Sequence, residues 1–293
     1  MTTQPNIEII AQHPDIVGEC PVWDVTRSSL LWTDNRSERI YRYTPASGQI
    51  ETVIEGHAAY GFTLQGDGSL LLFLNNTRIA HAAHGQVTTV IESLPGEENT
   101  RFNDVLVDRA GRILCGVLPT EGVSSGSLYS LSPDGQATKL HDGFSLPNGM
   151  AFSPDDRQLY VADTRARQIL VFDYDLPSGA VENPRTFATF TGDDAGSPDG
   201  VTVDINGGVW VAATGSWSVS RFAPDGTLDR SIKLNARKPT SVGFGGDDMA
   251  TLYVTTSSRE STPGEEIGPA AGALFAFQSG ASGTPEHTTN WRP

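Results

Sequence analysis

The stretch SLPNGMAFSPDDRQLYVAD, residues 145–163, combines the features that decide the fold. A short polar entrance at Asn148 is followed by an apolar strand, the turn SPDDR and a second, strongly apolar strand, LYVAD. A third strand, QILVFDYD, and the turn LPSG come next, before a fourth and more polar strand. This order predicts a unit of four antiparallel strands joined by tight turns.

The same unit recurs six times along the chain. Its first position falls at residues 19, 61, 103, 148, 199 and 241, in steps of 42, 42, 45, 51 and 42 residues. The strongly apolar second strand returns each time, as LLWTD, LLLFL, ILCGV, LYVAD, VWVAA and LYVTT. A period near 42 residues with four strands per unit is typical of a propeller blade. An all-β, six-bladed β-propeller is therefore predicted, and a generic all-β sandwich is the alternative.

The sixth unit, from about residue 241 to 279, is short of its outer strand. The N-terminal segment IEIIAQH, residues 7–13, could supply that strand and close the ring, which would hide two exposed strand edges. Because neither a helical period nor a linker interrupts the pattern, residues 1–293 are expected to form a single propeller domain.

Composition limits the classes of function. A net charge of −15 leaves no basic stripe for phosphates, which argues against nucleic acid and against anionic membrane surfaces. No apolar run approaches the roughly 20 residues that span a bilayer, and the N-terminus has no secretory signal pattern. With only Cys20 and Cys115, a disulfide framework is not expected and the cytoplasm is the expected compartment. Without a coiled coil or an apolar extension, we expect a monomer or a weak homo-oligomer.

The polar entrance residues predict a site in the channel. The first strand of each blade lines the central channel, so matching positions form a ring around the axis: Glu19, Gly61, Asn103, Asn148, Asp199 and Ser241. Local turn formation explains any single Asn or Asp before Gly. Four carboxylates or carboxamides together instead indicate a cation, because such groups are costly to bury alone. Oxygen ligands suit calcium, magnesium or manganese, and zinc is also possible.

Six longer motifs extend the pattern over nearly the whole chain: GECPVWD (18–24), RFNDVLVDRAGR (101–112), LPNGMAFSPD (146–155), SPDGVTVDINGGVWVA (197–212), GFGGDDMATLYVTT (243–256) and GALFAF (272–277). In combination they resemble the SMP-30/gluconolactonase/luciferin-regenerating-enzyme family, which includes regucalcin. The resemblance implies a six-bladed propeller with one divalent metal ion in the channel, calcium or zinc before magnesium or manganese, and a lactonase activity on a sugar lactone.

The resemblance also implies roles for individual residues. Glu19, Asn148 and Asp199 match the family's metal ligands, and Asp199 also matches the position given the acid/base role. The matching substrate-contacting positions are Arg101, Asn103 and Glu121. The chain departs from the family where GTM is usual, because Gly116, Val117 and Leu118 stand there and change the pocket wall on this side.

A lactone is an ester closed into a ring, and a divalent ion can polarise its carbonyl while Asp199 moves the proton. Arg101 could bind hydroxyls or a carboxylate, and a second basic residue at the channel mouth would favour diacid lactones. Phosphotriester hydrolysis on a related propeller and a non-enzymatic calcium-binding or interaction propeller are the alternatives. The complete polar set favours a small-molecule enzyme, because an interaction propeller does not need such a ring deep in its channel.

Overall fold

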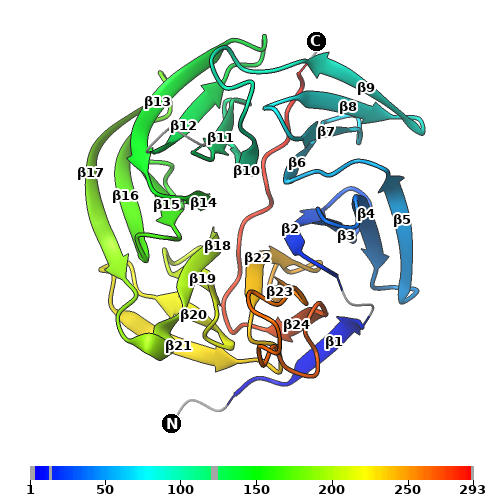
Figure 1. Ribbon diagram of the computed structural model, residues 1–293, viewed down its shortest axis with the longest axis vertical. Helices are drawn as coiled ribbons and strands as arrows, with labels where there is room; N and C mark the ends of the chain where they lie inside the picture. The colour runs from blue at the N-terminus through cyan, green and yellow to red at the C-terminus, as the bar shows by residue number, and fades with distance from the viewer. Residues whose placement is uncertain (1–3, 13–14, 120–124, 292–293) are drawn as a thin grey trace.

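The computed structural model describes residues 4–12, 15–119 and 125–291. Its strands form six four-stranded antiparallel sheets arranged around a central axis, which confirms the six-bladed β-propeller (Figure 1). Within the described part of the chain the only helical element is a single 3-10 turn, Asp193–Ala195. No helix in that part has the length and apolar character needed to cross a bilayer.

The blades follow one another in chain order, each running from the channel outward. Blade 1 contains β2 (Gly18–Asp24), β3 (Ser29–Asp34), β4 (Arg39–Thr44) and β5 (Gln49–Glu55). Blade 2 contains β6 (Gly61–Leu64), β7 (Leu70–Phe73), β8 (Ile79–Ala83) and β9 (Gln86–Ile91). Blade 3 contains β10 (Phe102–Val107), β11 (Ile113–Val117), β12 (Gly126–Leu131) and β13 (Ala137–Phe144).

The second half of the ring repeats this plan. Blade 4 contains β14 (Pro147–Phe152), β15 (Gln158–Asp163), β16 (Gln168–Asp175) and β17 (Ala180–Thr189). Blade 5 contains β18 (Ser197–Val203), β19 (Val209–Thr214), β20 (Ser218–Phe222) and β21 (Leu228–Lys233). Blade 6 contains β22 (Pro239–Gly245), β23 (Thr251–Thr256), β24 (Leu274–Gln278) and β1 (Ile7–Ala11).

The N-terminal strand completes blade 6, as the sequence predicted. β1 pairs antiparallel with β24, with Ile7 opposite Phe277 and Ile9 opposite Phe275. The outer edge of β24 is thereby covered, and the two ends of the ring are joined by backbone hydrogen bonds instead of a covalent link.

The hydrophobic core is divided among the six interfaces between neighbouring blades. One buried cluster lies at each interface. Trp32 packs between blades 6 and 1, and Trp210 packs between blades 5 and 6, both fully buried. Removing a side chain of this size typically costs about 3–5 kcal/mol, so each interface contributes strongly to holding the ring. Cys20 and Cys115 are both free thiols.

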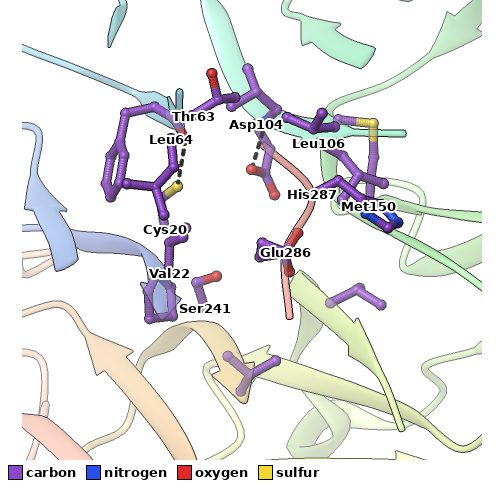
Figure 2. Close-up of a pocket in the computed structure, with 16 residues that line it drawn as sticks. Cys20, Val22, Thr63, Leu64, Asp104, Leu106, Met150, Ser241, Glu286 and His287 are labelled. Atoms are coloured by element: carbon purple, nitrogen blue, oxygen red, sulfur yellow. Dashed lines mark hydrogen bonds between the residues drawn. The ribbon is translucent and has the colours of Figure 1, made fainter. Parts of the chain in front are cut away.

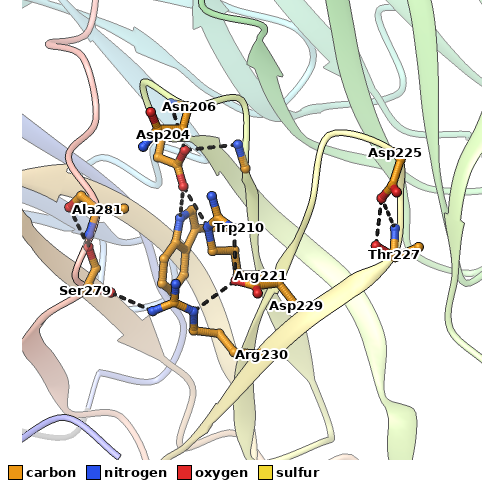
Figure 3. A network of polar contacts seen from close by, with 11 residues as sticks. Asp204, Asn206, Trp210, Arg221, Asp225, Thr227, Asp229, Arg230, Ser279 and Ala281 are labelled. Atoms are coloured by element: carbon orange, nitrogen blue, oxygen red, sulfur yellow. Dashed lines mark hydrogen bonds and ion pairs between the residues drawn. The ribbon is translucent and has the colours of Figure 1, made fainter. Parts of the chain in front are cut away.

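A polar network stabilises the far end of β18, the strand that carries the predicted Asp199 near its start (Figure 3). The Asp204 carboxylate is fully buried and accepts hydrogen bonds from Trp210 Nε1 at 2.9 Å and Arg221 Nε at 2.8 Å. Burial opposes its ionisation, but the bonds from Arg221, Trp210 and Gly208 outweigh it and lower the pKa of Asp204. The network therefore ties β18, β19 and β20 together with an ionised carboxylate.

The chain after β24 crosses the central channel (Figure 1). Gly283 pairs with Asp204 of blade 5, and Thr289 pairs with Gln65 of blade 2. Trp291 then joins the cluster between blades 2 and 3. Since Asp204 and Gln65 follow the last residues of their inner strands, this C-terminal tail (residues 279–291) crosses the channel at the end opposite the polar entrance residues.

Candidate functional site

The polar entrance residues meet at one end of the channel because their strands are bulged there. Strand pairing skips from Glu19 to Val22 in β2, from Phe102 to Val105 in β10, from Pro147 to Met150 in β14 and from Pro198 to Val201 in β18. A β-bulge leaves residues outside the hydrogen-bonded ladder and re-aims their side chains. Asn103, Asn148 and Asp199 occupy these bulges, and Glu19 flanks one.

Asn148 and Asp199 are in direct contact. Both side chains are buried, and Asn148 Nδ2 donates a hydrogen bond to Asp199 Oδ1 and another to Thr164 Oγ1. Both amide protons are then engaged within the protein, which leaves Asn148 Oδ1 as the atom that could bind a cation.

The neighbouring glycine makes this contact possible. A Cβ at Gly149 would collide with the backbone of Asp199 and Val201, so any other residue would push β14 and β18 apart. The close approach of β14 to β18 therefore depends on the absence of a side chain at this position.

Burial and mutual repulsion oppose the ionisation of the ring carboxyl groups. Burial, then the charges of Asp199 and Asp104, raise the pKa of Glu19 well above its usual value, against a weaker opposing effect of Arg101. Burial and Asp104 likewise raise the pKa of Asp199, against the hydrogen bond from Asn148. A cluster of carboxyl groups whose ionisation is opposed by burial and by mutual repulsion is a suitable environment for a divalent cation.

The donor set fits such an ion only if the amide takes part. Among the residues that the structure describes, no three His, Cys, Asp or Glu side chains are grouped so that they could hold a metal ion. Glu19 and Asp199 supply two carboxylates, and the Oδ1 atom of Asn148 completes an all-oxygen set of the kind that calcium, magnesium or manganese accept.

Arg101 and Asn103 lie beside the carboxylates, at the entrance of β10. Arg101 Nη1 donates to Asn103 Oδ1 at 3.1 Å and to the backbone oxygen of Phe102 at 3.0 Å. The guanidinium also lies over the ring of Tyr60, with Cζ 3.9 Å from the ring centroid. Asn103 Nδ2 donates to the backbone oxygen of Pro147 at 3.1 Å, which links blades 3 and 4. Both side chains are thus held in place before any ligand arrives.

Glu121, the third predicted substrate contact, lies outside the described residues. The flanking positions Gly116 and Val117 are buried in β11, and Leu118 donates its backbone N–H to the backbone oxygen of Arg101. The segment of residues 116–118, where the sequence departs from the family's GTM pattern, therefore lies next to Arg101 at the channel entrance.

The structure adds two acidic residues that the sequence did not single out as functional. Asp104 follows Asn103 in the β10 bulge, and Glu286 projects from the C-terminal tail into the same cavity (Figure 2). Burial, then the charge of Glu286, raise the pKa of Asp104 to about 7 against a hydrogen bond from Val105 N–H. Burial of its carboxyl group in the channel also raises the pKa of Glu286 to about 7, although the residue as a whole is exposed.

A signal for Asp104 was present in the repeats. The second bulge position is Gly149 in β14 and Gly200 in β18, where an added Cβ would meet the next blade. Asp104 is the charged member of this set. Glu286 had no such signal, because only the path of the tail brings it into the channel.

Comparison with known proteins places this geometry in a family. Residues 17–258 match the family model described as the SMP-30/gluconolactonase/LRE-like region. The chain belongs to this family. The match covers all of the strands that carry the polar ring and ends before the C-terminal tail begins.

Two curated members of the SMP-30/gluconolactonase/LRE-like family are similar over almost their full length. Pentonolactonase XacC of Haloferax volcanii is 36% identical over 94% of this chain and 95% of its own. The 6-deoxy-6-sulfogluconolactonase of Pseudomonas putida is 34% identical over 96% of this chain and 97% of its own. Among solved structures, a luciferin-regenerating enzyme superposes with a TM-score of 0.89 at 24% identity, over 97% of this chain and 99% of that one. At that identity the likeness shows the fold.

Proposed function

We propose that this protein is a divalent-metal-dependent hydrolase that opens a sugar lactone to the corresponding acid. The observation that carries the proposal is the meeting of Glu19, Asn148 and Asp199 with Arg101 and Asn103 at one end of the channel. The family membership supports it, because two members of similar length are named as lactonases of sugar acids.

Glu19, Asn148 and Asp199 are proposed to hold the cation through oxygen atoms. Their positions on β2, β14 and β18 make the site dependent on three different blades. When bound, the ion would polarise the lactone carbonyl and stabilise the negative charge that develops there.

Asp199 is proposed to move the proton. Its carboxylate is buried beside the proposed cation, and its hydrogen bond from Asn148 fixes its orientation. In hydrolysis it would accept a proton from the attacking water and return it to the ring oxygen as the ester bond breaks.

Arg101, Asn103 and Glu121 are proposed to bind the sugar. Arg101 uses only Nη1 in its side-chain hydrogen bonds to described residues, so other N–H groups of its fork can donate to substrate hydroxyls or to a carboxylate. The polar character of this wall also favours a hydroxylated substrate over an apolar phosphotriester.

The first test is a pH-indicator hydrolysis assay on a panel of aldono- and aldarolactones. Chelated protein would be compared with protein refilled with calcium, magnesium, manganese or zinc. We expect turnover of at least one lactone that disappears with the chelator and returns with one of the ions. Tight cation binding without turnover of any lactone would instead support the non-enzymatic alternative.

A further inference from the structure

Arg36 lies in the β3–β4 loop, which is fixed beside the segment leading to Glu19. The Asp34 carboxylate accepts hydrogen bonds from the backbone N–H groups of Ile16 and Val17 on one side and of Arg36 on the other. Asn35 N–H also donates to the backbone oxygen of Val17. The loop is therefore anchored at the same end of the channel as the ring of carboxylates and amides.

The same loop is anchored to the segment that leads to Tyr60. The backbone oxygen of Glu38 accepts hydrogen bonds from Gly56 N–H and His57 N–H. Tyr60 follows His57 closely in the chain, and the Arg101 guanidinium lies over its ring. Arg36, Tyr60 and Arg101 thus lie along one arc of the channel mouth, over blades 1 to 3.

The charge arrangement of these two arginines differs from that of their neighbours. On the same hairpin, Arg39 pairs with Glu55 at 2.6 Å and Arg42 pairs with Glu51 at 2.9 Å. Within the described part of the chain, neither Arg36 nor Arg101 forms a salt bridge. The negative charge of Glu19 attracts Arg101, but the Glu19 carboxylate is one of the proposed cation ligands and would be neutralised by the cation.

The positive charge of Arg36 acts on Arg101 at the channel mouth. Burial lowers the pKa of Arg101 most, Tyr60 opposes that shift, and the charge of Arg36 adds to it. Two like charges at one opening, neither of them in a salt bridge with a described residue, form a site for a negatively charged group. Arg36 is exposed, so its side chain is open to a ligand at the mouth.

We propose that Arg36, together with Arg101, selects lactones that carry an anionic substituent, a carboxylate in the first instance, at the carbon farthest from the reacting carbonyl. This inference rests on the proposed lactonase function and names its substrate class. The net charge of −15 repels anions at long range, so a preference for one requires cations placed at the mouth. The planar fork of arginine suits a carboxylate.

The test compares two lactones that differ at one carbon. Glucaro-1,4-lactone carries a carboxylate where glucono-1,4-lactone carries a hydroxymethyl group. The selectivity is the ratio of kcat/KM for the first to kcat/KM for the second. We expect the unmodified holoenzyme to favour the anionic lactone, and Arg36→Gln to reduce the ratio about 5- to 10-fold. Added salt should reduce the ratio in the unmodified enzyme more than in the variant.

Arg39→Gln is the matched control, since Arg39 lies on the same hairpin but is paired with Glu55, and it should leave the ratio unchanged. A ratio near one in the unmodified enzyme, or an equal loss on both lactones in Arg36→Gln, would overturn the inference and leave the lactonase function standing. Failure of the unmodified holoenzyme to open any lactone would overturn the proposed function itself.

Discussion

Asn148 and Gly149 occupy one β-bulge, and the two residues serve the site in different ways. Asn148 supplies the polar side chain, while the missing side chain of Gly149 lets β14 lie against the backbone of Asp199. The geometry of two proposed ligands on different blades therefore depends on a position that has no functional group of its own.

Gly149→Ala should disturb the site by separating the backbones of β14 and β18. The added methyl group would overlap the backbone of Asp199 and Val201, so we expect a loss of about 1–3 kcal/mol in the free energy of unfolding. Cation affinity should fall as well, because Asn148 and Asp199 move apart. Denaturant unfolding and titration with calcium would measure both effects.

Gly116→Ala provides the comparison for that experiment. A methyl group there would meet the Pro147 side chain at 3.4 Å, an ordinary contact distance, in a strand that carries no proposed ligand. Equal losses of stability and cation affinity in the two variants would show that the closeness of β14 and β18 has no special importance.

Asp199→Asn tests proton transfer at the proposed base. The amide keeps the size and one oxygen of the carboxylate but cannot accept the proton, so we expect kcat to fall about 10²- to 10⁴-fold with the cation at saturation. Circular dichroism would verify that the variant is folded. Full activity of the cation-saturated variant would remove Asp199 from the proton-transfer role.

At the scale of single residues, the sequence predicts those site residues that occupy matching positions in the repeat. Glu19, Asn103, Asn148 and Asp199 could be predicted to lie together because each lies near the start of an inner strand. Arg36 could not, because its place at the mouth depends on hydrogen bonds that its loop makes with Val17 and, through Glu38, with residues 56 and 57.

At the scale of elements, the Asp204 network shows how the far end of an inner strand is held. Arg221 is only 12% exposed in its side chain, and it pairs with Asp204 through Nε and with the more exposed Asp229 through Nη1. Removing the Asp204 carboxylate would therefore take away the fully buried one of its two partners. The strand β18 needs this support because its other end carries Asp199, where nearby carboxylates repel one another.

Asp204→Asn should therefore destabilise the fold without touching the proposed site. We expect a loss of about 1–3 kcal/mol in the free energy of unfolding at neutral pH, because a buried donor loses its acceptor while Arg221 keeps its ion pair with Asp229. The lowered pKa of Asp204 means that its contribution is present above the unfolded-state pKa and is lost as the pH falls through the folded-state pKa. The difference between variant and parent should shrink in strong acid, as measured by denaturant unfolding.

Asp225→Asn is the control within the same blade. Asp225 caps a surface turn through Thr227 and carries no buried partner, so its loss should cost about 1 kcal/mol or less. If the two variants lose the same stability, the buried network does not brace β18 as argued.

At the scale of the whole molecule, the blades bring several acidic residues together in one channel, and this changes how those residues ionise. The pKa values of Glu19 and Asp199 are raised, and that of Asp104 is raised to about 7, so in the cation-free protein these groups lose their protons at higher pH than ordinary carboxyl groups do. A divalent cation lowers these pKa values, so its binding should release protons.

The apparent cation affinity should accordingly rise with pH from about 5 to 7, where exposed carboxyl groups are already ionised. Isothermal titration calorimetry in two buffers of different ionisation enthalpy would count the protons released on binding. If the measured binding enthalpy at pH 6 did not depend on the buffer, no protons would be released, and the proposed coupling between cation binding and carboxyl ionisation would be contradicted.

The architecture as a whole was the most predictable level. A repeat of about 42 residues predicts blades, and the short sixth unit predicts that the N-terminal segment closes it. The C-terminal tail was not predicted, because residues 279–291 have no strand pattern and take their path from contacts with Gln65 and Asp204. Glu286 enters the channel only through that path.

The pairing of β1 with β24 also sets the order in which the ring can form during synthesis. β1 leaves the ribosome before the strands of blades 1 to 5, and its partner β24 is completed only at Gln278, after all of them. Until then β1 has no strand beside it and blades 1 and 6 cannot meet. The nascent chain must therefore keep its first strand from pairing with other chains while five blades assemble, and closing the ring is the last step.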